Sequence, residues 1–284
     1  MSVLAQSSPP SLSTVRINFG WIKQAWTLFS AQSGLWVGAV LLSFLIGAVM
    51  FIVFGLPTGL FDGLQSVYYS VYLHKQAPPV PLPNPTLEFA KGEVFGILVG
   101  GASMILSGGL YQMALRQIRG EPISVFGVFS AFPQSLPLFL VGCVVPIVSG
   151  IAEALLKWPL HHFLPPLSET FINNFSLVLS TLLNGLLMFA PFLVLDANAS
   201  IPDALVGSVR LLKGQVLRGL WFYIVASVAG GLGLIFCGVG MLATYPVFLF
   251  SVTLAYLAMT RSVQPVPEFD PSPAGVWPPP PRIP

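Results

Sequence analysis

Hydrophobic residues along this chain fall into long uncharged stretches, and the longest of them covers residues 219–259. These 41 residues include no Asp, Glu, Lys, Arg or His. At about 1.5 Å of rise per residue, a single helix of that length would span roughly twice the ~30 Å hydrocarbon core of a bilayer. The two glycines of Cys237-Gly238-Val239-Gly240 supply the backbone freedom that a tight reversal needs. The pattern therefore predicts a transmembrane hairpin of two spans.

Four further apolar stretches are long enough to cross a bilayer. They are predicted at residues 33–54, 94–115, 135–156 and 175–195. Together with the hairpin they make six spans. The longest connection, residues 55–92, carries a proline-rich run that we expect to be extended. Residues 157–174 are predicted to form the loop between the third and fourth spans.

Three shorter segments have an amphipathic pattern, with apolar residues at steps of four and then three. Their apolar anchors are Ile22/Trp26/Phe29, Val125/Phe129/Phe132 and Leu205/Val209/Leu212. This spacing is typical of helices that lie on a membrane surface. Ser200 is placed to cap the third of these helices, and Asp203 falls in its first turn.

Composition and charge place the chain in a membrane. Hydrophobic residues make up 55% of the 284 residues and charged residues 8%, against about 25% charged in a soluble domain. The net charge of +2 gives no reason to expect a nucleic-acid partner. Nine of the twelve Lys and Arg residues fall on one side of the six-span arrangement, which predicts that both termini lie in the cytoplasm and the protein in the cytoplasmic (inner) membrane.

The order of these segments predicts an all-α integral membrane protein with an internal repeat. Each amphipathic segment is cytoplasmic and precedes two spans, so the chain divides into three copies of one unit with parallel topology. A pseudo-three-fold axis along the membrane normal would relate such copies. We expect residues 1–15 to be a mobile leader, 16–261 the membrane domain and 262–284 a proline-rich cytoplasmic tail.

Two stretches also carry a family resemblance. They are GGLYQMALRQIRGEPISVFGVFSAF and the region from ANASIPDALVGSVRLLKG to the end of the hairpin. The matching features are Arg119-Gly120, Ser208 with Arg210, and the Gly-x-Gly turn followed by Thr244 and Pro246. Over residues 17–258 the chain resembles a poorly characterised bacterial six-span membrane domain, found alone or fused to glycerophosphodiester phosphodiesterases. The resemblance implies the membrane fold and no catalytic residues.

Polar side chains inside the predicted spans are the first candidates for a site, because burying them in a bilayer is unfavourable. Glu153 lies near the end of its span, where it would either anchor the helix or belong to a site. Asn184 lies mid-span, where it would bond across helices or face an inner pocket. Such a pocket would be lined by Glu153 and Asn184 together with Tyr111, Gln112, Ser180 and Thr181.

The predicted loop at 157–174 contains two adjacent histidines, His161 and His162. They are expected to be solvated, and no Cys or carboxylate spacing around them completes a metal set. A single imidazole would, however, suffice as the axial ligand of a porphyrin-type pigment, so a chlorin is kept as an alternative.

No reactive constellation is found, so we expect a protein without enzyme activity of its own. The leading hypothesis is an accessory or structural protein that packs against a larger membrane complex or membrane lipid. The alternative is a carrier of a hydrophobic ligand, a carotenoid, chlorin or quinone, held between aromatic-lined helices. A third alternative is a small-molecule transporter with a polar route near Asn184 and Tyr111.

Overall fold

The computed structural model describes residues 16–58, 85–163, 165–236 and 238–260. Within these ranges every regular element is an α-helix or a 3-10 helix. Six segments are long and apolar enough to cross a membrane: Ser33–Gly55, Ala90–Ile118, Val125–Leu156, Phe171–Ala197, Val216–Ile235 and Met241–Thr260. Each overlaps one of the six predicted spans, and the third also takes in the segment around Val125 that was predicted to lie on the membrane surface. The prediction of an all-α, multi-pass membrane protein is confirmed.

The described elements are all helical. In chain order they are α1 (Gly20–Ala31), α2 (Ser33–Thr58), α4 (Pro85–Ile118), η1 (Val125–Gln134), α5 (Ser135–Phe163), α6 (Pro165–Leu186), α7 (Ala190–Ala197), α8 (Ile201–Leu211), α9 (Val216–Gly231), η2 (Leu232–Phe236) and α10 (Met241–Thr260).

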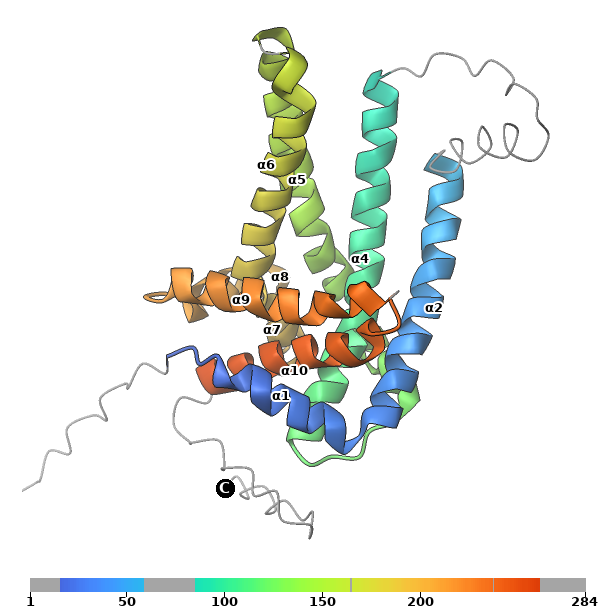
Figure 1. Ribbon diagram of the computed structural model, residues 1–284, viewed down its shortest axis with the longest axis vertical. Helices are drawn as coiled ribbons and strands as arrows, with labels where there is room; N and C mark the ends of the chain where they lie inside the picture. Colours follow the sequence, from blue (N-terminus) through green and yellow to red (C-terminus); the bar gives the residue numbers. More distant parts are fainter. Residues whose placement is uncertain (1–15, 59–84, 164, 237, 261–284) are drawn as a thin grey trace, which may run out of the picture.

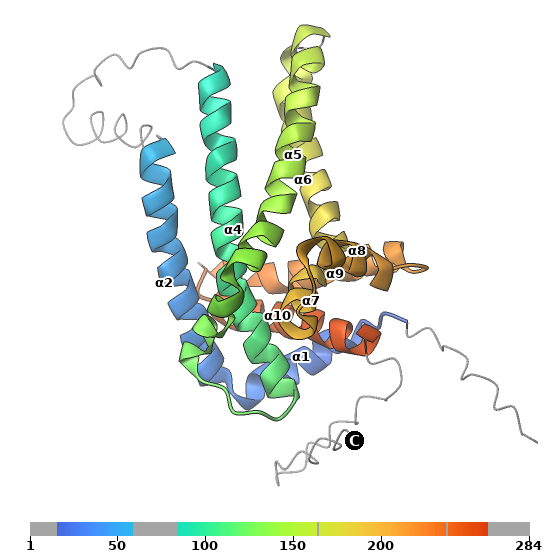
Figure 2. The same cartoon turned by 180° about the vertical axis from the view of Figure 1, so that it is seen from behind.

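The long helices form two sets with different directions. Figure 1 shows α2, α4, α5 and α6 upright, whereas α1, α9 and α10 lie across them, and the reverse view in Figure 2 agrees. The predicted order of a short helix and two spans recurs three times. The third hairpin, α9 and α10, nevertheless lies across the first two, so the predicted three-fold axis does not relate the three units.

Helix α10 is at the centre of the molecule. Its side chains are apolar on all sides, and eleven of its twenty residues are buried, among them Pro246, Phe250 and Tyr256. Helix α1 lies along it, α2 and α4 contact it, and α9 packs back against it. A helix that is apolar all round is stable when protein covers every face. The uncharged hairpin is thus a core element as well as a membrane segment.

Helices α4 and α5 pack closely because glycines face each other. A Cβ on Gly142 would come within 2.6 Å of the Gly100 carbonyl oxygen, and one on Gly101 within 2.5 Å of the Phe139 ring. Small residues allow such close approach of transmembrane helices. Gly34 and Gly96, by contrast, would meet no neighbour within 4 Å.

Protein covers one face of the first amphipathic helix. Trp21, Ala25, Leu28 and the predicted anchor Phe29 are buried, whereas the predicted anchor Trp26 is 52% exposed. The cause is α10: the face of α1 that lies along it is covered by protein.

The second amphipathic segment is a 3-10 helix rather than an α-helix. Val128 and Ala131 are buried three residues apart, and Phe126, Phe129 and Phe132 are exposed at the same spacing. A 3-10 helix has three residues per turn, so each set occupies one face.

The third amphipathic helix, α8, begins as predicted. The Ser200 hydroxyl oxygen accepts a hydrogen bond from the Asp203 backbone N–H at 3.4 Å, and Asp203 lies in the first turn. Further along, the buried Ser208 hydroxyl donates to the Leu186 carbonyl at 2.7 Å and accepts from the Phe189 N–H at 3.2 Å. Ser208 therefore closes the break between α6 and α7.

The prediction of a loop at residues 157–174 is wrong. The chain continues as helix to Phe163 and resumes as helix at Pro165. Hydropathy marks where an apolar stretch ends and not where a helix ends, and this segment includes Lys157, Glu169 and both histidines. The predicted leader (1–15), the proline-rich part of the first connection and the tail (262–284) lie outside the described residues.

Candidate functional site

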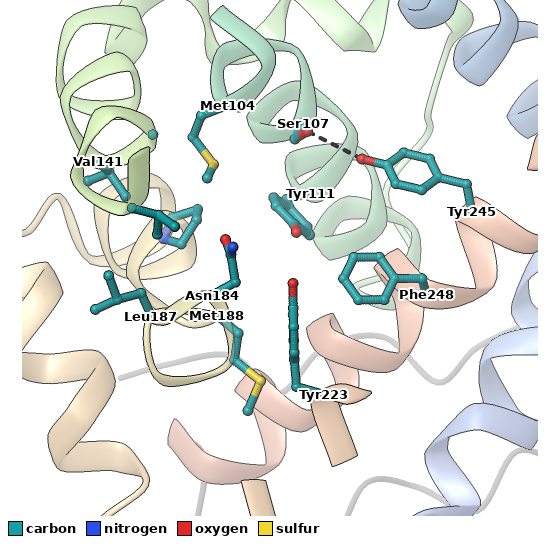
Figure 3. A pocket seen from close by; sticks show the side chains of 13 residues that line it. Met104, Ser107, Tyr111, Val141, Asn184, Leu187, Met188, Tyr223, Tyr245 and Phe248 are labelled. Atoms are coloured by element: carbon teal, nitrogen blue, oxygen red, sulfur yellow. Dashed lines mark hydrogen bonds between the residues drawn. The ribbon is translucent and has the colours of Figure 1, made fainter. Parts of the chain in front are cut away.

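A cavity of about 250 Å³ lies where α4, α5, α6, α7, α9 and α10 meet. Figure 3 shows its lining side chains converging from these elements. The residues that line it are Met104, Ser107, Tyr111, Val141, Gly142, Val145, Asn184, Leu187, Met188, Pro191, Tyr223, Tyr245 and Phe248. None of the thirteen is an Asp, Glu, Lys, Arg or His, so the cavity has hydrogen-bonding groups but no formal charge.

The polar groups of the cavity are only partly paired with one another. Ser107 Oγ and Tyr245 Oη lie 3.3 Å apart, and the Asn184 amide donates to the Ser180 carbonyl at 2.8 Å. Tyr111 is 9% exposed, and among the described residues its hydroxyl has no hydrogen-bond partner. A hydroxyl that borders a cavity and has no protein partner is free to bond to a polar atom placed there. The Tyr111 hydroxyl is therefore a candidate binding group of the cavity.

Aromatic rings form one wall of the cavity. Phe248 is stacked on Tyr245 with ring centroids 6.2 Å apart and meets Tyr223 edge-on at 6.0 Å. Tyr223 belongs to α9, and Tyr245 and Phe248 belong to α10. Both helices thus contribute flat aromatic surfaces to the cavity, and such surfaces pack well against planar groups.

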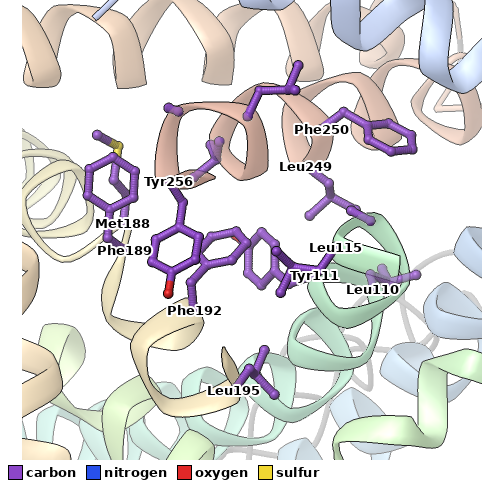
Figure 4. Close-up of a cluster of buried hydrophobic side chains, with 14 of the residues drawn as sticks. Leu110, Tyr111, Leu115, Met188, Phe189, Phe192, Leu195, Leu249, Phe250 and Tyr256 are labelled. Atoms are coloured by element: carbon purple, nitrogen blue, oxygen red, sulfur yellow. The ribbon is translucent and has the colours of Figure 1, made fainter. Parts of the chain in front are cut away.

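A row of buried rings leads from the cavity to a polar cluster at the far end of α4. Figure 4 shows Tyr111, Phe192 and Tyr256 side by side, with ring centroids 4.5 Å and then 4.9 Å apart. The Tyr256 hydroxyl donates to Asp196 Oδ2 at 3.3 Å, and Asp196 is paired with Arg119. The cavity and the ion pair are joined by continuous aromatic contact.

Two of the six residues expected to line an inner pocket do so. Tyr111 and Asn184 line the cavity, whereas Gln112, Glu153, Ser180 and Thr181 do not. The hydroxyls of Ser180 and Thr181 bond to the Leu177 carbonyl within their own helix, at 3.0 Å and 2.7 Å. Gln112 Oε1 is buried away from the cavity and has no partner among the described residues.

The expectation that Asn184 bonds across helices is wrong. Its side chain donates to the Ser180 carbonyl, four residues earlier in the same helix, where residues four apart lie on one face. Glu153 is half-buried on α5 and is not a lining residue of the cavity.

His161 and His162 lie in the last turn of α5, and their side chains are outside the described part of the chain. The residue of α5 that lines the cavity and is closest in sequence to His161 is Val145, sixteen residues earlier. At about 1.5 Å per residue the two positions are roughly 24 Å apart along the helix. The histidines and the cavity are therefore separate.

Sequence reasoning missed most of the polar lining, namely Ser107, Tyr223 and Tyr245. The two tyrosines belong to the uncharged hairpin, where hydropathy alone gives no reason to single out a residue. A signal existed: a tyrosine buried in an aliphatic helix usually needs a partner for its hydroxyl.

Comparison with protein-family models, curated proteins and solved structures finds no match to this chain. The resemblance to the six-span membrane domain stays a prediction.

Proposed function

We propose that the protein is a non-enzymatic, multi-pass membrane protein that holds one small hydrophobic ligand in the cavity between α4, α5, α6, α7, α9 and α10. The observation that carries the proposal is the cavity itself: about 250 Å³, uncharged, walled by aromatic rings and lined from six elements. Concave, mostly apolar sites with a few convergent polar groups are typical of small-molecule binding.

The size of the cavity limits the ligand. Drug-sized ligands occupy pockets of roughly 300–1,000 Å³, so about 250 Å³ suits one small head group better than a whole pigment. A chlorin macrocycle would also require an axial ligand, and none of the lining residues is a histidine. Among the hydrophobic ligands expected from the sequence, a quinone fits this cavity best.

We place the protein in the cytoplasmic membrane with both termini inside. The support is the distribution of charge along the described helices. Arg116 and Arg119 lie at the end of α4, and Arg210, Lys213 and Arg218 are exposed around the connection of α8 and α9. Lys91 lies near the opposite end of α4. An excess of Lys and Arg marks the cytoplasmic side.

The test is a comparison of the molecules that co-purify with two valine variants of α5. Val145 lines the cavity, and Val148, three residues further on, is 39% exposed. Val145→Phe fills the cavity, whereas Val148→Phe adds the same ring to an outer face. Organic extracts of the wild type and Val148→Phe are expected to contain a lipophilic compound at about one molecule per chain, and extracts of Val145→Phe to lack it. The proposal fails if all three proteins carry the same bulk phospholipid and nothing else.

A second candidate function is an accessory protein that packs against a larger complex. The observation in its favour is a set of glycines with open space beside them. A Cβ at Gly34 or Gly47 of α2, or at Gly92 or Gly96 of α4, would meet nothing within 4 Å. Such positions allow another helix to approach closely.

The accessory function predicts a partner that survives gentle purification and is lost when one of these positions is filled. Gly34→Leu is the variant, and Gly231→Leu is its control, because Gly231 on α9 is equally open. Retention of the same partner by Gly34→Leu, or its absence from the wild type, would contradict the accessory function.

A further inference from the structure

We propose that the ligand of the cavity carries a planar ring with carbonyl oxygens, of the quinone class, and that the Tyr111 hydroxyl donates a hydrogen bond to one of those oxygens. This inference rests on the proposed function and specifies its ligand. It concerns binding alone and includes no electron transfer.

The cavity has two hydrogen-bond donors that can serve an acceptor on the ligand. Tyr111 is 91% buried, points into the space between the lining residues (Figure 3) and has no partner among the described residues. The Asn184 Nδ2 carries two hydrogens and uses one of them on Ser180, so the second amide hydrogen is a further donor. A carbonyl oxygen has two lone pairs and accepts from such donors.

The absence of formal charge from the lining removes other head groups from consideration. A phosphate, carboxylate or ammonium group enclosed here would have no counter-charge among the thirteen lining residues. Burying an unpaired charge is strongly unfavourable. The site therefore disfavours phospholipid head groups and suits a neutral one.

The aromatic wall adds a preference for a flat ring. Phe248 contacts both Tyr245 and Tyr223, and their ring centroids lie 6.2 Å and 6.0 Å from its own. The Tyr245 hydroxyl is already hydrogen-bonded to Ser107. Its ring is therefore the part of the side chain that can contact a ligand. Offset-stacked and edge-on ring pairs are favourable at such separations. A planar conjugated ring gains these contacts, and a branched aliphatic group does not.

The experiment is a titration of the full chain in nanodiscs of one fixed phosphatidylcholine composition. Two probes are compared: a benzoquinone with a decyl chain, and decylbenzene, which has the same tail and no oxygen. The readout is the rise in thermal unfolding temperature, since a ligand that binds only the folded protein stabilises it by an amount that grows with the logarithm of its concentration over its Kd. The variants are Tyr111→Phe, which removes one hydroxyl, and Val145→Phe, which fills the cavity. The control is Ser180→Ala, whose hydroxyl faces away from the cavity.

For wild type and Ser180→Ala we expect the quinone to bind about three- to tenfold more tightly than decylbenzene, as one net hydrogen bond supplies. Tyr111→Phe should reduce that preference to within about twofold while leaving decylbenzene binding unchanged. Equal binding of both probes to the wild type, with both lost in Val145→Phe, would overturn the carbonyl assignment and leave the ligand-binding function standing. Failure of the quinone to stabilise the wild type also overturns the assignment, and the co-purified ligand of the Val145→Phe comparison then decides the proposed function separately.

Discussion

Tyr111 and Tyr256 are at opposite ends of the same row of rings, and they differ in what their hydroxyls do. Both are buried, at 9% and 2% exposure, and both contact Phe192. The Tyr256 hydroxyl is bonded to Asp196, which is itself paired with Arg119. The Tyr111 hydroxyl faces a cavity and has no partner in the described part of the chain. Paired polar groups of this protein hold helices together, and unpaired ones that face a space are available to a ligand.

The largest effect is expected from breaking the paired end. Arg119→Leu leaves Asp196 partly buried without its counter-charge. Loss of one partner from a buried ion pair costs about 3–5 kcal/mol, and the two side chains are 29% and 26% exposed. We therefore expect a loss of about 2–3 kcal/mol in the free energy of unfolding. The measurement is thermal unfolding in one fixed detergent, where each kcal/mol corresponds to about 2–4 °C.

The matched control is Arg116→Leu on the same helix. Arg116 lies 4.0 Å from Glu121, and the side chains are 42% and 51% exposed. An exposed pair contributes about 0–1 kcal/mol. If Arg119→Leu unfolded at the same temperature as Arg116→Leu, the paired end would have no special role in stability.

A smaller loss in the free energy of unfolding is expected from a substitution at the break between α6 and α7. Ser208→Ala removes the hydroxyl that bonds to both Leu186 and Phe189, so a buried carbonyl and a buried N–H lose their partner at a cost of about 1–2 kcal/mol. Ser149→Ala is the comparison, because the Ser149 hydroxyl is also buried but has no partner among the described residues. Its removal should leave the unfolding temperature unchanged or raise it. Equal losses in the two variants would sink the distinction between paired and unpaired groups.

The smallest effect compares the two tyrosines directly. Tyr256→Phe keeps the ring contacts and removes one hydrogen bond, so it should cost about 0.5–1 kcal/mol. Tyr111→Phe should not destabilise the ligand-free protein, because its hydroxyl makes no bond there. Both variants are measured after removal of co-purified lipids by detergent exchange. A ligand-free Tyr111→Phe as unstable as Tyr256→Phe would mean that the Tyr111 hydroxyl is structural.

The six spans could be predicted from the sequence because hydropathy depends on composition alone. The bounds agree best for the first span, which was predicted at 33–54 and is found at Ser33–Gly55. The Ser200 cap was predictable for the same reason: it depends on residues close together in the chain.

The direction of the last hairpin could not be predicted in this way. Every face of α10 is apolar, so its pattern gives no indication of which neighbours cover which side. Its position across α2 and α4 is decided by contacts between residues far apart in sequence, such as Trp36 with Phe250. The cavity lining could likewise be predicted only in part. Tyr111 and Asn184 were candidates because they are polar residues in predicted spans, whereas Tyr223 and Tyr245 belong to the uncharged hairpin, in which the sequence indicated no site residue.

The residues that carry the family resemblance have structural roles in the described chain. Arg119 pairs with Asp196, and Gly120 has φ 76°, a conformation that glycine adopts readily. Ser208 closes the α6–α7 break, and the Thr244 hydroxyl donates to the Gly230 carbonyl at 2.6 Å within the last hairpin. None of these residues lines the cavity.

The most direct test of the central claim is an experimental structure of the full chain in nanodiscs with the decyl-substituted benzoquinone present. We expect density for one planar ring in the cavity, with an oxygen within about 3 Å of the Tyr111 hydroxyl. Probe density confined to the outer faces of the helices, with ordered water or collapsed side chains between Tyr111, Asn184 and Tyr223, would contradict the assignment of this cavity as a ligand site.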